Sequence, residues 1–115
     1  DSRVDKLIEM YRSNQARACG LYYLNENSVS FELGGRTWKA YGSPWSPRFG
    51  DMAFNYLPGE EADIHVGKIP EDIDILLTHC PPRGILDTTH EGISAGCPSL
   101  ARKVNDCRPK IHAFG

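Results

Sequence analysis

The second half of the sequence holds the pattern that most restricts the possible folds. Two short apolar segments, Ile73 to Thr78 and Ile111 to Phe114, flank a predicted helix. Pro98 suits the first turn of that helix, where its missing N–H needs no partner, and Pro109 ends it. The helix carries an apolar stripe made of Leu100, Ala101, Val104 and Cys107. Strand, helix and strand at this spacing predict a βαβ unit with two parallel strands and a right-handed crossover. Its first strand is expected to be buried on both faces.

The first half of the chain predicts a helix followed by antiparallel strands. Because Val4, Leu7, Ile8 and Tyr11 recur at helical spacing, we expect an amphipathic helix from Ser2 to about Ser13. Strands are predicted over Arg17–Leu24, Ser28–Leu33 and Arg36–Tyr41, and Gly34-Gly35 is a two-residue hairpin signal. Residues 17 to 41 would then form an antiparallel meander. The following stretch predicts an ordered loop, a short strand, and a loop with a helical turn, over Gly42–Gly50, Asp51–Tyr56 and Pro58–Lys68.

Composition excludes several classes of protein. The 115 residues are 40% hydrophobic and 24% charged, as is usual for one small globular domain. A net charge of -2 gives no electrostatic footprint for nucleic acid or an anionic membrane. No apolar run approaches the roughly 20 residues that cross a bilayer. Four cysteines without a C-x-x-C pair favour reduced thiols in an intracellular, cytoplasmic protein, with two disulfides as the alternative. Since the sequence starts at Asp1 and stops where a strand enters a loop, we expect residues 1–115 to be one domain truncated at both ends.

His79 stands where the predicted topology favours a site. Ligands of parallel sheets gather at the carboxyl ends of the strands, and His79 directly follows the first strand of the βαβ unit. Pro81 and Pro82 fix φ and remove two N–H donors, so the exit of the strand is rigid. The long loop over residues 83 to 96 can cover the edge of the sheet. In the alternative interpretation, His79 has a structural role and hydrogen-bonds to backbone carbonyls.

Four segments together resemble one family. They are "YGSPWSPRFGDMAFN" at 41–55, "DILLTHCPPRGILD" at 74–87, "GCPSLARKV" at 96–104 and "RPKIHAFG" at 108–115. They closely resemble the calcineurin-like metallophosphoesterases, in the subgroup of metallophosphoesterase-domain proteins, and the resemblance extends over residues 36–115. It implies an α/β fold, part of a four-layer αββα sandwich with a two-metal site. The family's metal ligands come from Asp-x-His, Gly-Asp, Gly-Asn-His, a later histidine and Gly-His-x-His. The later histidine maps onto His79, and Gly115 matches the first residue of the last motif. Asp1 matches the acidic residue that often follows Gly-Asn-His.

The resemblance implies hydrolysis of a phosphate ester by a hydroxide that two divalent ions activate. The ions could be Mn, Fe, Zn or Mg, and His79 would bind one of them. His79 alone cannot assemble the pair, so this segment by itself is expected to be inactive. Cys80 departs from the family's usual glycine; it is either a buried thiol or a soft ligand that changes the metal preference. His90 is a candidate substrate contact from the edge loop.

The other histidines and the remaining cysteines are weaker candidates. His112 is one position out of phase with Ile111 and Ala113, and the resemblance implies a structural role, because the family residue at this position precedes the ligand pair and is not a ligand. His65 is expected to be a solvated loop residue. An alternative zinc site could draw its ligands from His79, Cys80, His90, Cys97, Cys107 and His112. The spacing of these residues matches no compact zinc module.

Two rival functions remain open. One is a non-catalytic module on a phosphoesterase fold that binds a nucleotide or a protein, with an interaction surface made by Trp38, Trp45, Phe49 and Phe54. The other is a structural fragment that completes a domain with another chain. The expected partners are a phosphate-ester substrate and the remaining part of the same domain, without nucleic-acid polymer or membrane.

Overall fold

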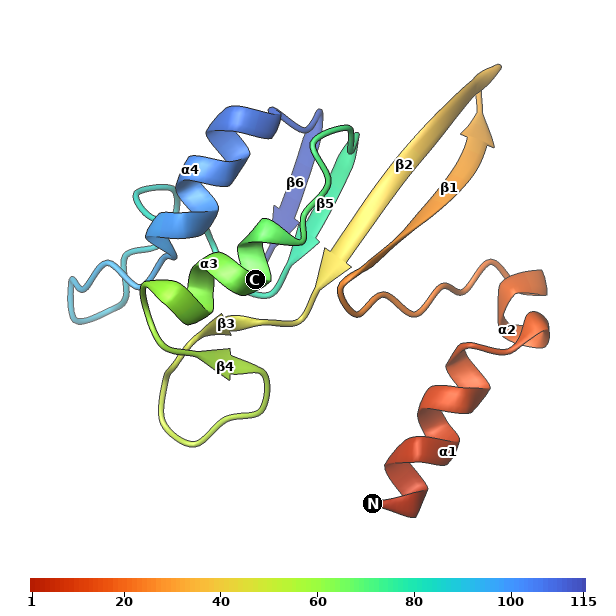
Figure 1. The fold of residues 1–115 in the computed structure, drawn as a ribbon, viewed down its shortest axis with the longest axis horizontal. Helices are drawn as coiled ribbons and strands as arrows, with labels where there is room; N and C mark the ends of the chain where they lie inside the picture. Colours follow the sequence, from red (N-terminus) through yellow and green to blue (C-terminus); the bar gives the residue numbers. More distant parts are fainter.

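The computed structural model describes all residues from Asp1 to Gly115. It is a mixed α/β structure in which α3 and α4 pack against one face of a four-stranded sheet, while α1 and α2 lie beyond the β1–β2 hairpin (Figure 1). The helices are α1 (Ser2–Tyr11), α2 (Asn14–Ala18), α3 (Glu60–Gly67) and α4 (Pro98–Cys107). The strands are β1 (Asn27–Leu33), β2 (Arg36–Ser43), β3 (Ser46–Pro47), β4 (Asn55–Tyr56), β5 (Ile75–Thr78) and β6 (Ile111–Phe114). No helix is both long enough and apolar enough to span a membrane.

The sheet confirms the predicted βαβ unit. Its strand order is β1-β2-β5-β6, with β1 and β2 antiparallel and the other two pairs parallel. Helix α4 connects β5 to β6 and begins at Pro98, as predicted. Gly34 and Gly35 join β1 to β2 with φ of +63° and +73°, which is the conformation that a two-residue hairpin turn requires.

Asp74 fixes the register at the amino end of β5. Its carboxylate lies 2.6 Å from Arg36 Nη2 and 3.0 Å from Lys110 Nζ, and it accepts a hydrogen bond from the backbone N–H of Lys39 at 2.9 Å. These contacts join β2, β5 and the start of β6 at one end of the sheet. The opposite, carboxyl end is free to carry other groups.

One face of the sheet is packed and the other is open. The core contains Tyr41 and Leu76 from the strands, Ala62 and Val66 from α3, and Leu100 from α4. Alternate strand residues point to the opposite face, which we call the open face. Its apolar members are Val29, Phe31, Leu33, Trp38, Ala40, Ile75, Leu77, Ile111 and Ala113, and the polar Asn27 and Arg36 lie on the same face. The expectation that β5 is buried on both faces is therefore wrong for this chain. Leu76 is 1% exposed but Leu77 is 40% exposed, because the helices cover only one side.

The predicted strand over residues 17–24 is also wrong, so the meander is a two-stranded hairpin. Ser13 caps α2 by accepting a hydrogen bond from the backbone N–H of Ala16 at 3.1 Å. The N–H of Leu21 then donates to the Ala16 carbonyl at 2.9 Å, so local contacts satisfy backbone groups that a strand would have paired. Further along, a helical turn was expected within residues 58–68, and the structure has the eight-residue helix α3 there. Of the short strand predicted over residues 51–56, only Asn55–Tyr56 forms a strand, β4.

Candidate functional site at the carboxyl edge of the sheet

The strands β5 and β6 end side by side. Thr78 pairs with Phe114 in the parallel register, and one residue later the N–H of Gly115 donates to the His79 carbonyl at 3.1 Å. The His79 side chain is exposed and makes no hydrogen bond or ion pair within the chain. The carboxyl edge of the sheet thus carries an unpartnered imidazole beside the end of β6. The predicted βαβ topology also locates His79 at this edge.

Thr78 fixes the turn behind His79. Its hydroxyl donates to the Cys80 carbonyl at 2.7 Å and lies 2.8 Å from His112 Nε2. Burial lowers the pKa of His112, which favours the neutral ring. The ring also packs against Phe114 at 5.0 Å between centroids. This geometry gives His112 a structural position, as the resemblance implied.

Cys80 points into the core, away from the edge. Its side chain is buried, with Sγ 3.8 Å from Tyr56 Oη and 3.9 Å from the Trp45 carbonyl. Burial raises the pKa of the thiol to about 11, so the thiolate that a metal needs is disfavoured. All four cysteines are free, and Cys80 and Cys97 are buried.

The loop over residues 83–97 is internally braced. Asp87 is buried and accepts hydrogen bonds from the Ser94 hydroxyl and, at 3.0 Å, from the Gly96 N–H. The hydrogen bond from Ser94, with those from backbone amides, lowers the pKa of Asp87 despite its burial. At Gly96, an added Cβ would lie 2.6 Å from Arg83 Cα, so the loop needs glycine to approach the turn after His79. His90 is exposed on this loop.

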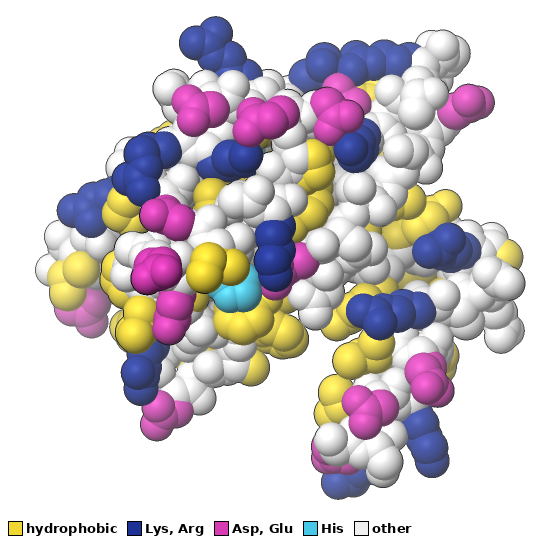
Figure 2. All heavy atoms as spheres, viewed as in Figure 1, with side chains coloured by type: hydrophobic (Ala, Val, Ile, Leu, Met, Phe, Trp, Pro, Cys, Tyr) yellow, Lys and Arg dark blue, Asp and Glu magenta, His cyan; other side chains and the backbone are white.

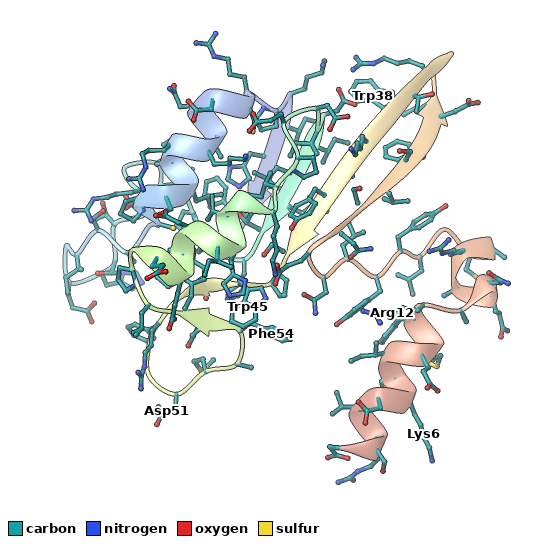
Figure 3. All side chains as sticks on the ribbon, in the orientation of Figure 1. Lys6, Arg12, Trp38, Trp45, Asp51 and Phe54 are labelled. Carbon is teal, nitrogen blue, oxygen red and sulfur yellow. The ribbon has the colours of Figure 1, made fainter.

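His65 corrects the sequence interpretation, because it lies on α3 and is largely buried. Its Nδ1 is 3.1 Å from Glu26 Oε1, and its ring stacks on Trp45 at 3.8 Å between centroids. Lys68 Nζ lies 2.6 Å from the second oxygen of Glu26. Trp45 and Phe54, labelled in Figure 3, meet edge to face at 5.7 Å below α3. Nothing in the sequence signalled the cluster, because its members are far apart along the chain and follow no periodic spacing.

The chain does not assemble a complete metal site by itself. No three histidine, cysteine or acidic side chains are placed so that they could hold one ion. Of the alternative zinc set, Cys107 lies at the far end of α4, where Sγ is 3.8 Å from the Pro70 carbonyl, and Cys97 caps the start of α4. Acidic and basic side chains are interspersed over the face in Figure 2, so no large patch of one sign marks another site there.

The fold and the edge define a class: a mixed α/β protein with a free imidazole at the carboxyl ends of parallel strands. No profile of a known protein family matches the chain. A UPF0046 protein of Caenorhabditis elegans is 40% identical over 94 residues, which are 81% of this chain and 23% of that protein. Metallophosphoesterase domain-containing protein 1 of Homo sapiens is 35% identical over 109 residues, which are 93% of this chain and 32% of that protein. A probable rhamnogalacturonate lyase C of Emericella nidulans is 37% identical over 98 residues, but these are only 9% of that protein.

The chain belongs to a metallophosphoesterase-related family that includes the human protein and the UPF0046 proteins. It spans between about a quarter and a third of the length of these relatives. The match to the lyase covers too little of that protein for its name to describe this segment.

Proposed function

We propose that the chain is part of a metal-dependent phosphoesterase domain that hydrolyses a phosphate ester. The substrate would be a phosphodiester or a phosphomonoester, with nucleotides as one candidate. The observation that carries this proposal is the position of His79, whose imidazole is exposed, unpartnered and adjacent to the end of β6. The relatives support the family, and the exposed position of His79 supports its choice as the metal ligand.

His79 fits the role of a metal ligand. A neutral imidazole is the commonest metal ligand in proteins, and this ring has no competing partner in the chain. By the resemblance, a histidine pair would follow Gly115, whose N–H already donates to the His79 carbonyl at 3.1 Å. Such a pair would therefore lie beside His79. Two divalent ions, Mn, Fe, Zn or Mg, would supply an activated hydroxide and offset the charge that develops on the phosphoryl group.

The residues of this chain hold His79 in place. The Thr78 hydroxyl bonds to the Cys80 carbonyl, and the fixed φ of Pro81 and Pro82 limits movement of the turn. A ligand on a rigid turn loses little conformational freedom when it binds an ion. Because the chain supplies one ligand, the segment alone should not hydrolyse the substrate.

The same proposal assigns the open face to the rest of the domain. In the four-layer sandwich that the resemblance implies, a second sheet packs on the face that α3 and α4 leave uncovered. Leu33, Leu77 and Ile111 are 66%, 40% and 53% exposed on that face. Their burial against another sheet would be favourable, at roughly 25 cal/mol per Å² of apolar surface.

The test is hydrolysis by the intact protein that carries this chain. We expect it to cleave an aryl phosphodiester or an aryl phosphomonoester with added Mn²⁺, and we expect His79→Ala to lower kcat/KM at least about a hundredfold. Lys6→Ala, on the outer surface of α1 (Figure 3), should leave the rate unchanged. An intact protein that binds metal without turnover would instead support the non-catalytic module, and His79→Ala with full activity would exclude His79 as a ligand.

A further inference from the structure

A cavity of about 660 Å³ lies beside the His79 turn but does not include His79. Its walls come from the start of the β3–β4 loop, the first turn of α3, the loop over 83–97 and the first turn of α4, which all lie on the helical side of the sheet (Figure 1). Arg48, Arg83 and Arg102 line it, and Glu91 is the one carboxylate among the lining residues. The lining therefore carries a net positive charge of two units, from three arginines and one glutamate, in a chain whose net charge is -2.

The three guanidinium groups are weakly engaged elsewhere. Arg83 makes no ion pair in the chain, although its backbone N–H is held by the Cys97 carbonyl at 3.1 Å. Arg48 reaches Asp51 only at 3.5 Å, and Asp51 points into solvent at the tip of its loop (Figure 3). Arg102 reaches Asp63 at the same distance and also donates to the Ser99 hydroxyl at 3.2 Å. An exposed pair at this separation contributes little, so each arginine can turn to a stronger acceptor.

Apolar groups complete the cavity. Phe49 is 84% exposed and Ile93 is 61% exposed, and both stand among the lining residues with Pro47. The volume is well above that of an inorganic anion and falls in the range of small-molecule sites. Three arginines suit a doubly charged oxyanion, because a guanidinium pairs with phosphate through two parallel hydrogen bonds.

We infer that this cavity binds an organic phosphate monoester, with the phosphate on Arg83, Arg102 and Arg48 and the organic group against Phe49 and Ile93. The inference goes beyond the proposed hydrolysis, because binding here needs neither metal nor turnover. The site lies on the loop that begins four residues after His79, so an occupied cavity would restrain that loop.

The test is calorimetric titration of the intact protein with phenyl phosphate and with inorganic phosphate, in a metal chelator and in the His79→Ala background. These conditions remove binding at a metal site, so the result is independent of the proposed hydrolysis. Phenyl phosphate should bind, and Arg83→Gln should weaken it about tenfold through loss of a charge-assisted contact. Arg17→Gln, an exposed arginine on α2, is the matched control and should change nothing. Phe49→Ala should weaken phenyl phosphate more than inorganic phosphate.

Two results would overturn the inference. One is the absence of phenyl phosphate binding at millimolar concentration in chelator. The other is an equal loss with Arg83→Gln and Arg17→Gln, which would show general charge screening in place of a site. Because Arg83 and Phe49 are exposed side chains, both variants should fold.

Discussion

At the scale of single residues, Glu26 connects the start of the β1–β2 hairpin to helix α3. It precedes β1, has a φ of +55°, and holds both His65 and Lys68 of the α3 region. A non-glycine residue in the left-handed region costs free energy unless its surroundings hold it there. The contacts of Glu26 with Lys68 and His65, and the stack of His65 on Trp45, provide that restraint.

We predict that Glu26→Gln lowers the free energy of unfolding by about 1 kcal/mol at neutral pH. Burial alone would raise the pKa of Glu26, but the hydrogen bonds from Lys68 and His65 outweigh it and hold the pKa below the ordinary 4.5. The stabilisation is therefore present above the unfolded pKa and is lost as the pH falls through the folded pKa. Denaturant unfolding of both proteins, from neutral pH to below pH 4.5, measures this difference.

The difference between the two proteins should shrink towards zero at the acidic end. Glu32→Gln, exposed on β1, serves as the control and should have almost no effect at any pH. A gap between wild type and Glu26→Gln that stays constant across the range would show that the Glu26 charge is not responsible.

At the scale of elements, periodic segments were predictable and locally capped ones were not. The alternating pattern of Ser28–Leu33, followed by Gly34-Gly35, predicts a hairpin, and the chain forms one. Pro98 predicts the start of a helix, and α4 begins there. The strand predicted over Arg17–Leu24 does not form. Its apolar residues suit a strand, but Ser13 caps the short helix α2, and the backbone groups after this helix make local hydrogen bonds. The same distinction holds for the site. The predicted βαβ topology was enough to locate His79 at the carboxyl edge of the sheet, whereas no sequence pattern predicted the contact between His65 and Glu26.

Gly96 tests how firmly the 83–97 loop is attached to the turn after His79. A Cβ at this buried position would lie 2.6 Å from both Arg83 Cα and the Pro82 carbonyl, and backbone atoms cannot yield cheaply. We predict that Gly96→Ala costs about 2 kcal/mol of stability in denaturant unfolding. Gly67→Ala, at the end of α3 with open space around it, should be neutral or slightly stabilising. Equal stability of the two variants would mean that the loop is loosely attached.

At the scale of the whole molecule, helices cover one face of the sheet and leave the open face exposed. The two helices bury one side of the sheet, and nine residues on the open face are apolar, with Asn27 and Arg36 at the starts of β1 and β2 as its polar members. Contiguous exposed apolar surface of this kind marks a place where another element packs. The relatives, of which the chain spans at most about a third, are long enough to supply one.

We predict that the isolated 115-residue chain binds a hydrophobic dye such as anilinonaphthalene sulfonate under native conditions, because the open face offers apolar surface. Dye fluorescence measured alongside light scattering would show whether the surface is free or covered by self-association. Leu77→Lys, in the centre of the open face, should reduce the signal, whereas Leu7→Lys on α1 should reduce it less. A monomeric chain with a sharp thermal transition and no dye binding would contradict an incomplete domain.

Calorimetric titration of the intact protein with Mn²⁺ shows whether His79 is a metal ligand. We predict stoichiometric binding that His79→Ala weakens by at least about tenfold, since each lost ligand removes a substantial part of the affinity. His90→Ala, which removes another exposed imidazole from the nearby loop, should leave the metal affinity unchanged. Equal metal affinity of wild type and His79→Ala, or an intact protein that binds no divalent metal, would show that His79 is not a metal ligand.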